Sequence, residues 1–300
     1  MSTLQRLTER GLVKPPRWLP GNVQYETIMG STAYDVSTDS SDLDLYGWAI
    51  PPKDDIFPHL RGEIPGFGNP AGRFEQYQEH HVQDRDALAG HGRTCDLTIF
   101  GVVKFFALAM ENNPNIIDSL FTPTTCVLYS TKVGHLVREN RRLFLHKGAW
   151  SKFKGYAYSQ LHKIAIKQPQ GKRATLVAEH GYDTKFAYHV VRLIGEVEQI
   201  LTEGDVDLQR DNERLKAIRR GEWTEQRLRT WFAEKESQLE RAYAESKLRP
   251  NPDEEWIKAL LLDVLEEHYG SLADCVVDPN RAVVALRNIQ AELDRVKDLL

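Results

Sequence analysis

The chain is poor in cysteine and contains no long apolar run. Its 300 residues include three cysteines without a regular spacing, which argues against a disulfide-built fold and favours free thiols in a reducing compartment. The longest apolar runs, such as residues 259–262, are far shorter than the roughly 20 residues that a membrane span needs. No charged segment followed by an apolar one opens the chain, so no secretion signal is expected. These absences predict a soluble cytoplasmic protein.

An overall excess of positive charge is also missing. The 43 acidic residues outnumber the 39 Lys and Arg, and the formal net charge is −4 at pH 7. This balance excludes a globally basic nucleic-acid binder. One segment departs from it, because residues 150–195 hold eight Lys and Arg against two acidic residues. The charge balance therefore does not exclude a local nucleic-acid-binding surface in this segment.

Apolar residues follow a period of two in the first part of the chain and a helical period after about residue 130. Alternation predicts strands at 23–29 and 42–50, and Pro51-Pro52 ends the second of these. Further strands are expected at 74–82 and 94–100. Helices are expected at about 131–143, 150–167, 184–203, 224–247, 253–268 and 281–300. The sequence thus predicts an α+β fold, with a domain at 1–130 followed by an all-helical domain at 131–300.

The most distinctive motif is a Gly-Ser pair followed by two closely spaced aspartates. Asp42 and Asp44 lie two residues apart at the start of an expected strand, so their side chains point to the same face. Mg²⁺ prefers oxygen ligands and is usually held by one or two carboxylates plus substrate phosphates. Gly30 and Ser31 offer a close backbone approach and a hydroxyl to a phosphate. Together these residues predict a metal-dependent phosphoryl or nucleotidyl transfer site.

Two-metal transfer needs carboxylates that bridge a pair of cations about 4 Å apart. Asp96, within the expected strand at 94–100, is the best third ligand, and it would also help draw the proton from the attacking hydroxyl. The alternative for Asp96 is a helix N-cap, and for Asp42 and Asp44 it is a solvated strand edge. A calcium loop is excluded, because an EF-hand starting at Asp35 would need Gly and Glu where Ser40 and Tyr46 stand.

These motifs resemble the nucleotidyltransferases of the DNA polymerase beta superfamily, and most of all the predicted RNA-repair-pathway group of bacteria and phages. The similarity spans most of residues 23–225. The segments that carry it are 30–34, 41–47, 96–106, 112–118, 152–161, 183–193 and 218–221. Asp35 departs from the pattern, since it stands where the group usually has Gly. This departure implies either a different turn geometry or a left-handed residue, a conformation that Asp tolerates better than most residues.

The resemblance implies a mixed-sheet catalytic core with helices behind it. It also implies two Mg²⁺ ions as cofactors, with Mn²⁺ as a substitute, and a nucleoside triphosphate as donor. Gly30 and Ser31 would contact the β- and γ-phosphates. Asp42, Asp44 and Asp96 would hold the metals.

Two cationic patterns lie in the basic segment. Lys185, His189 and Arg192 share one stripe of an expected helix, so they form either a cationic face over the triphosphate or acceptor strand, or a solvated face. Lys152 and Lys154 alternate with aromatic residues that include Tyr156. This pattern suits a nucleic-acid surface and equally an amphipathic helix with its aromatics in the core. A zinc site at His80, His81, His91 and Cys95 is disfavoured, because no paired ligand spacing is present.

We therefore expect a Mg²⁺-dependent nucleotidyltransferase that moves a nucleoside monophosphate from a triphosphate onto a hydroxyl and releases pyrophosphate. The expected acceptor is an RNA or other nucleic-acid 3′-end. Two alternatives stay open: an acceptor hydroxyl on a protein or a small molecule, and a non-catalytic nucleotide- or RNA-binding module. The nucleobase, templating, the oligomeric state and the role of residues 226–300 are not determined. The amphipathic segment 281–300 packs either on the domain or on another subunit.

Overall fold

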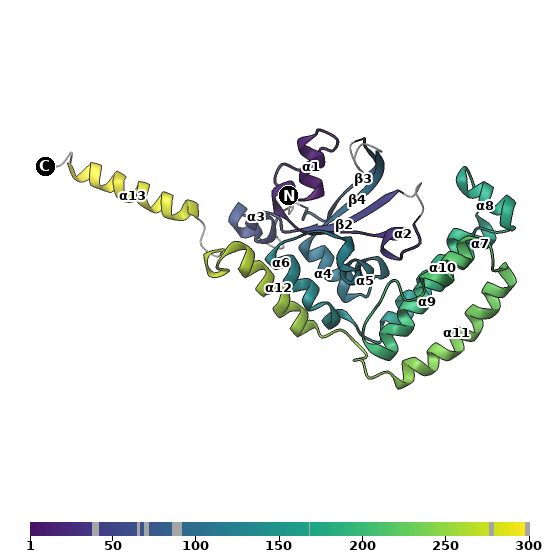
Figure 1. Cartoon of the computed structure of the whole chain (residues 1–300). Coiled ribbons are helices and arrows are strands. Elements are labelled where there is room, and N and C mark those ends of the chain that lie inside the picture. The colour runs from purple at the N-terminus through teal and green to yellow at the C-terminus, as the bar shows by residue number, and fades with distance from the viewer. Residues whose placement is uncertain are drawn as a thin grey trace.

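A five-stranded mixed sheet forms the centre of the N-terminal part (Figure 1). The computed structural model describes residues 1–37, 42–64, 67–68, 72–85, 92–167, 169–275 and 279–297. The strand order is β3-β4-β2-β1-β5, and the β2–β4 pair is parallel whereas the other neighbouring pairs are antiparallel. The strands are β1 (Val23–Ile28), β2 (Leu43–Ala49), β3 (Gln76–Asp84), β4 (Arg93–Gly101) and β5 (Val127–Ser130).

Alternation along β2 separates its two faces as the sequence predicts. Leu45 and Ala49 are buried on one face, in a core shared with Leu4 and Leu7 of the first helix. Trp48 is buried on the other face and stacks on Phe105 with 5.7 Å between ring centroids. Since side chains alternate along a strand, Asp44 lies on the same face as Trp48.

Helices cover both faces of the sheet. Helix α1 lies on one face, and α4, α5, α6 and α12 lie on the other (Figure 1). The helices of this part are α1 (Thr3–Glu9), α2 (Gly30–Ala33), α3 (Lys53–Ile56), α4 (Val102–Met110), α5 (Pro114–Phe121) and α6 (Lys132–Glu139). Residues 53–64 contain α3 and a short 3₁₀ helix at Pro58–Arg61.

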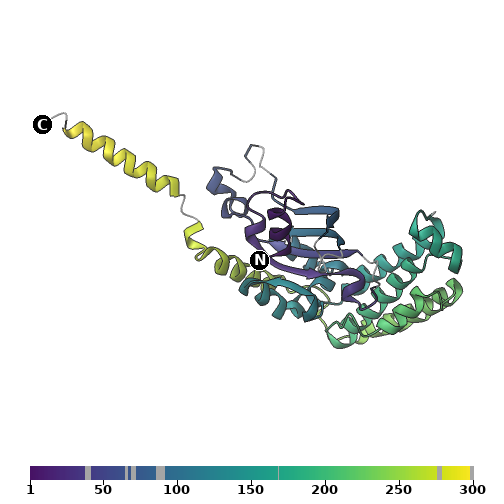
Figure 2. The same ribbon diagram turned by 45° about the horizontal axis from the view of Figure 1, so that its top comes forward.

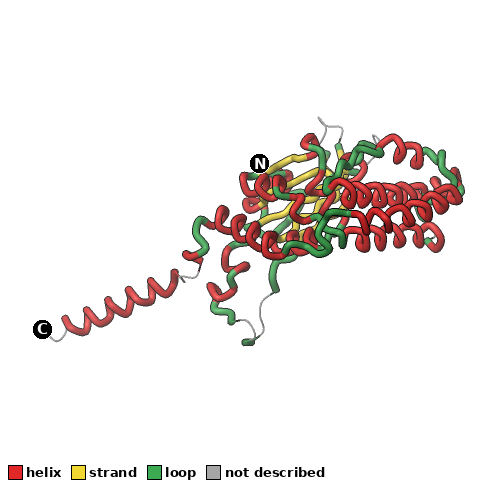
Figure 3. The backbone as a smooth tube through the Cα atoms, turned by 90° about the horizontal axis from the view of Figure 1, so that it is seen from below, coloured by secondary structure: helices red, strands yellow, loops and turns green. Residues whose placement is uncertain are grey.

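The rest of the described chain is helical, with no strand after Ser130 in those ranges. Helices α7, α9 and α11 lie side by side, and α12 returns along α4 and α6 at the sheet (Figure 1, Figure 3). The remaining helices are α7 (Ala149–Ile166), α8 (Lys172–His180), α9 (Thr184–Glu203), α10 (Asn212–Arg219), α11 (Glu225–Glu245), α12 (Glu254–Tyr269) and α13 (Pro279–Lys297). The predicted fold class, an α+β sheet region followed by a helical region, is confirmed.

One continuous apolar core joins the two regions. It runs from Tyr25 and Trp48 of the sheet, through Phe105, to Val190 of α9 and Val264 of α12. The expected division into domains at residue 130 stays a prediction. Within the described ranges, no helix combines the length and apolar character that a membrane crossing requires.

Candidate active site

The parallel pairing of β2 and β4 brings two of the predicted carboxylates together. Asp44 pairs directly with Asp96 in the strand register, so both side chains lie on the same face of adjacent strands. Asp42 precedes β2 and is exposed. Burial raises the pKa of the Asp44 carboxyl, the negative charges of Asp96 and Asp42 raise it further, and the positive charge of Lys185 lowers it. Asp44 therefore lies close enough to Asp96 and Asp42 to be affected by their negative charges.

The Gly30 turn lies directly against Asp44. The Met29 N–H donates to the Asp44 carbonyl oxygen at 2.7 Å, and Gly30 has a left-handed backbone with φ of +64°. A Cβ atom at Gly30 would lie 2.0 Å from Asp44 Oδ2. Only glycine fits here, and the turn with the half-buried Ser31 lies beside the carboxylates, as a phosphate-binding turn next to a metal site would.

The turn after α2 is held by residues far along the chain. Asp35 is left-handed with φ of +53°, which is one of the two alternatives expected for this position. Its Oδ2 accepts hydrogen bonds from Asn212 Nδ2 at 2.8 Å and from Lys216 Nζ at 2.9 Å. Arg219 donates to the Val36 carbonyl oxygen. The α10 region therefore fixes the turn, and no local sequence signal points to these contacts because the partners are about 180 residues apart.

Asp96 has a second set of neighbours that the sequence analysis did not assign to it. The His81 N–H donates to Asp96 Oδ1 at 2.7 Å, from an irregular point of β3 where His81 has a φ of +56°. His80 Nδ1 lies 3.7 Å from Asp96 Oδ2. The bulge thus orients the Asp96 carboxylate.

Among the described residues, those weighed for a zinc site do not all come together. Cys95 belongs to the core on the opposite face of the sheet from Asp96, and His91 lies outside the described residues. Within the part of the chain that the structure describes, no three His, Cys, Asp or Glu side chains converge tightly enough to hold a metal by themselves. Metal binding at the aspartates would therefore draw further ligands from substrate phosphates or water.

Arg192 lies in a buried network rather than on an open cationic face. Its side chain is 5% exposed and donates to Asp118 and, at 2.9 Å, to Glu196. The Tyr34 hydroxyl donates to Asp118 Oδ2 at 2.7 Å, and the Arg192 guanidinium lies 4.6 Å from the Tyr34 ring centroid. The structure does not support the expected phosphate contact of Arg192, because two internal carboxylates already engage it.

The other two members of that stripe differ from each other. Lys185 is exposed at the start of α9, and its charge acts on Asp44. His189 is half-buried. Burial lowers the pKa of His189 well below its usual value, and the positive charges of Arg192 and Lys185 lower it further. His189 is therefore neutral at pH 7, and Lys185 is the member of the stripe that faces the carboxylates as a cation.

The predicted nucleic-acid residues of α7 are engaged by other side chains. Lys152 Nζ lies 2.9 Å from a Glu111 carboxylate oxygen. Lys154 Nζ lies 2.9 Å from Glu240 and 3.1 Å from Glu236, both on α11. The Tyr156 hydroxyl accepts from Asn113 Nδ2 at 3.0 Å. The local charge excess of residues 150–195 is thus partly neutralised by carboxylates outside that segment.

A different cationic cluster surrounds the Phe186 ring at the start of α9. The Arg173 guanidinium lies 4.0 Å from the ring centroid, and the ammonium groups of Lys163 and Lys167 lie 5.9 and 5.8 Å from it. Arg173 pairs with Asp183 at 3.5 Å, whereas neither lysine has a carboxylate partner among the described residues. A cavity of about 350 Å³ lies beside it, lined by Lys167, Pro169, Gln170, Arg173 and Asp183.

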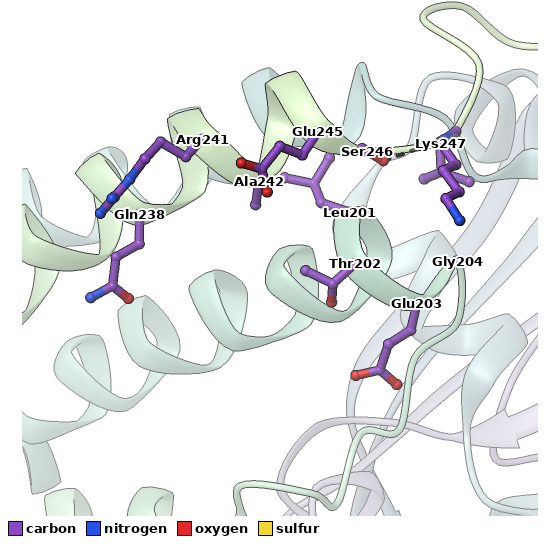
Figure 4. Close-up of a pocket in the computed structure, with 11 residues that line it drawn as sticks. Leu201, Thr202, Glu203, Gly204, Gln238, Arg241, Ala242, Glu245, Ser246 and Lys247 are labelled. Carbon is purple, nitrogen blue, oxygen red and sulfur yellow. Dashed lines mark hydrogen bonds between the residues drawn. The ribbon is translucent and has the colours of Figure 1, made fainter.

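A larger cavity of about 640 Å³ lies between the C-terminal ends of α9 and α11 (Figure 4). Its lining includes Glu203 and Lys247, and none of the three predicted metal ligands contributes to it. This hollow is therefore not the place where the carboxylates meet.

Comparison with known proteins places the chain in a family. The sequence model of the RNA repair pathway DNA polymerase beta family (RlaP) matches residues 2–263. A solved nucleotidyltransferase-like protein from Exiguobacterium sibiricum 255-15 is similar at 12% identity, over 79% of this chain and 75% of that one, with a TM-score of 0.28, which is too low to carry an argument. No curated protein matches significantly. Since the family match covers nearly the whole chain, this protein belongs to the RNA repair pathway DNA polymerase beta family and is a nucleotidyltransferase of the DNA polymerase beta type.

Proposed function

We propose that the protein transfers a nucleoside monophosphate from a nucleoside triphosphate to a hydroxyl and releases pyrophosphate. The observation that carries this proposal is the direct pairing of Asp44 with Asp96 beside the Gly30 turn. The repulsion that contributes to the raised pKa of Asp44 would be relieved by divalent cations, and an all-oxygen donor set suits Mg²⁺ or Mn²⁺. When bound, two such ions would activate the attacking hydroxyl and neutralise the leaving phosphate.

The side chains around the metal ligands have separate roles in this proposal. The Gly30 and Ser31 N–H groups and the Ser31 hydroxyl would hold the β- and γ-phosphates. Lys185 would place a positive charge opposite the carboxylates. Asp96, oriented by the His81 N–H, would take part in removing the proton from the acceptor hydroxyl.

The acceptor we propose is an RNA 3′-end. Membership of an RNA repair family supports it, and so does the cationic cluster of Lys163, Lys167 and Arg173 near the start of α9. Lys163 and Lys167 have no carboxylate partner among the described residues, unlike Arg173, which pairs with Asp183, so the two lysines are free to bind phosphates. For that reason we assign strand binding to this cluster ahead of Lys152, Lys154 and Tyr156.

The test is label transfer by the full chain. Purified protein is incubated with each radiolabelled triphosphate, Mg²⁺ or Mn²⁺, and a total-RNA pool. We expect Asp44→Asn and Asp96→Asn to lower Mg²⁺-dependent labelling of RNA by about 10³-fold or more, because each removes a metal-bridging charge. Asp263→Asn, an exposed position on α12, is the matched control and should label at the wild-type rate. Unchanged labelling in both active-site variants would refute the proposal.

The same assay separates the alternative acceptors. Labelling that needs no RNA and depends little on salt would indicate a protein or small-molecule acceptor, since phosphate-backbone binding is steeply salt-dependent. Triphosphate binding that depends on Mg²⁺ but gives no transfer to any acceptor would indicate a non-catalytic binding module.

A further inference from the structure

Helix α13 presents an apolar stripe that the rest of the molecule leaves uncovered. All three ribbon and tube views show it extending away from the body (Figure 1, Figure 2, Figure 3). Its larger apolar side chains between Val283 and Val296 are 45% to 66% exposed. The family match ends at residue 263, before this helix begins. The stripe therefore lies outside the residues that the family model matches.

The apolar residues of α13 follow a heptad pattern. Leu286 and Leu293 occupy one core position, called a, and Ala282, Ile289 and Val296 occupy the other, called d. The spacing alternates between four and three residues, which is the repeat of a coiled coil. Such a seam is buried by other helices that carry the same repeat.

Charge beside the seam identifies the partner as another copy of this chain in parallel orientation. Glu292 is at position g and Lys297 is at position e of the next heptad. In a parallel coiled coil these two positions on neighbouring helices face each other, so Glu292 would lie opposite Lys297 of a second copy. In an antiparallel arrangement g faces g and e faces e, so this Glu–Lys pair would not form. The intrahelical pairs of these residues, with Arg295 at 3.0 Å and Asp294 at 3.9 Å, are exposed and therefore weak.

The residue types in the seam favour more than two strands. Leu at a with Ile at d shifts the preference from two strands to three or four, and Ile289 occupies d between Leu286 and Leu293. Val283 at e and Ala285 at g are also apolar, which suits the wider buried face of a four-stranded assembly. We propose that α13 joins four copies of this chain through a parallel coiled coil.

Assembly and helix stability are coupled in this proposal. The helix has 19 residues, a length of about 28 Å, and isolated helices of this size are marginal in water. Self-association should therefore depend on concentration. The proposal does not rest on the proposed reaction, so the two can fail separately.

The experiment measures the mass of the full chain in solution by sedimentation equilibrium over a wide concentration range. We expect a species of four times the 34.4 kDa chain mass. Leu293→Asp should shift it to single chains, because it places a charge in the seam. Val284→Asp is the matched control, since Val284 is 51% exposed on the same helix but outside the a and d positions, and it should leave the assembly intact.

Four outcomes would overturn the proposal. A single chain at every concentration contradicts assembly, and an assembly that survives Leu293→Asp contradicts the seam. A stable dimer contradicts the four-stranded packing. Orientation is tested by charge exchange: Glu292→Lys alone should weaken the assembly, and adding Lys297→Glu should restore it. Failure of the second change to restore the assembly rules out the parallel arrangement.

Discussion

At the scale of single residues, the contact between Gly30 and Asp44 is the most restrictive feature of the candidate site. Three independent constraints meet there: a left-handed backbone at Gly30, a carboxylate oxygen where a Cβ would be, and a backbone hydrogen bond from Met29 to Asp44. A phosphate-binding turn placed this close to a metal ligand would hold the triphosphate at the metals. The Gly-Ser motif therefore has a steric reason as well as a chemical one.

Gly30→Ala should inactivate the enzyme and destabilise it. The added Cβ would meet Asp44 Oδ2 at 2.0 Å, and a left-handed Ala costs about 1–2 kcal/mol before that clash is counted. Label transfer and chemical unfolding measure the two effects. Gly155→Ala is the matched control, because nothing lies within 4 Å of its Cβ position in α7, and it should stabilise the fold by about 0.5–1 kcal/mol. An active, stable Gly30→Ala variant would contradict the described turn.

His189 should make the protein less stable in mild acid. Burial and nearby cations hold its pKa well below the usual value, so below about pH 6.5 the unfolded chain binds a proton that the folded chain does not. The free energy of unfolding should fall as pH decreases from about 6.5, by at most about 1.4 kcal/mol per pH unit for this one group.

His189→Gln should flatten that part of the stability curve, measured by urea unfolding between about pH 5 and 7. His162→Gln, on an exposed part of α7, is the control and should follow the wild-type curve. If both variants keep the wild-type slope, the buried imidazole is not its source.

At the scale of elements, the helical region determines which cations are free. Helix α11 provides Glu236 and Glu240 for Lys154 of α7. No equivalent carboxylates meet Lys163 and Lys167 among the described residues. The two ends of one helix therefore have different electrostatic roles, although both look basic in the sequence.

The double variant Lys163→Ala, Lys167→Ala should weaken binding of single-stranded RNA and reduce its salt dependence. Each lost phosphate contact lowers the slope of log affinity against log salt by about 0.7, so a decrease of about 1.4 is expected. The matched control is Lys152→Ala, Lys154→Ala, which removes the same charge from positions that are already paired. A larger effect in the control pair would assign RNA binding to the other end of α7.

At the scale of the whole molecule, the continuous core couples the sheet to the helical region. Aromatic side chains of β2 and α4 belong to the same apolar cluster as α7, α9 and α12. Interactions that cross from one region to the other make separate unfolding costly. We therefore expect residues 1–275 to unfold in one cooperative transition, even though the sequence predicts two domains.

Phe105→Ala tests that coupling, because Phe105 is 1% exposed and stacks on Trp48. It should lower the free energy of unfolding by about 3–5 kcal/mol. Calorimetry should show one transition with a lowered midpoint. If a second transition kept the wild-type midpoint, the two regions would be independent.

Features that depend on short spacings could be predicted before the fold was known. The alternation of β2 and the left-handed Asp35 follow from residues close together in the chain, and the family resemblance follows from several short motifs. Local backbone geometry controls these features, so a local pattern predicts them. Asp96 was predicted as a third metal ligand because a two-metal site needs several carboxylates. Its position directly opposite Asp44 is set by the register between β2 and β4.

Which charged side chains are open to solvent depends on how distant segments of the chain pack together. Arg192 and Lys185 lie on one helix, yet Arg192 is enclosed by Asp118 and Glu196 while Lys185 is exposed. Lys216 reaches Asp35 from 181 residues away. A charge's availability depends on its distance to opposite charges and to solvent, and both distances are set by which segments pack together. A linear spacing contains no information about those distances.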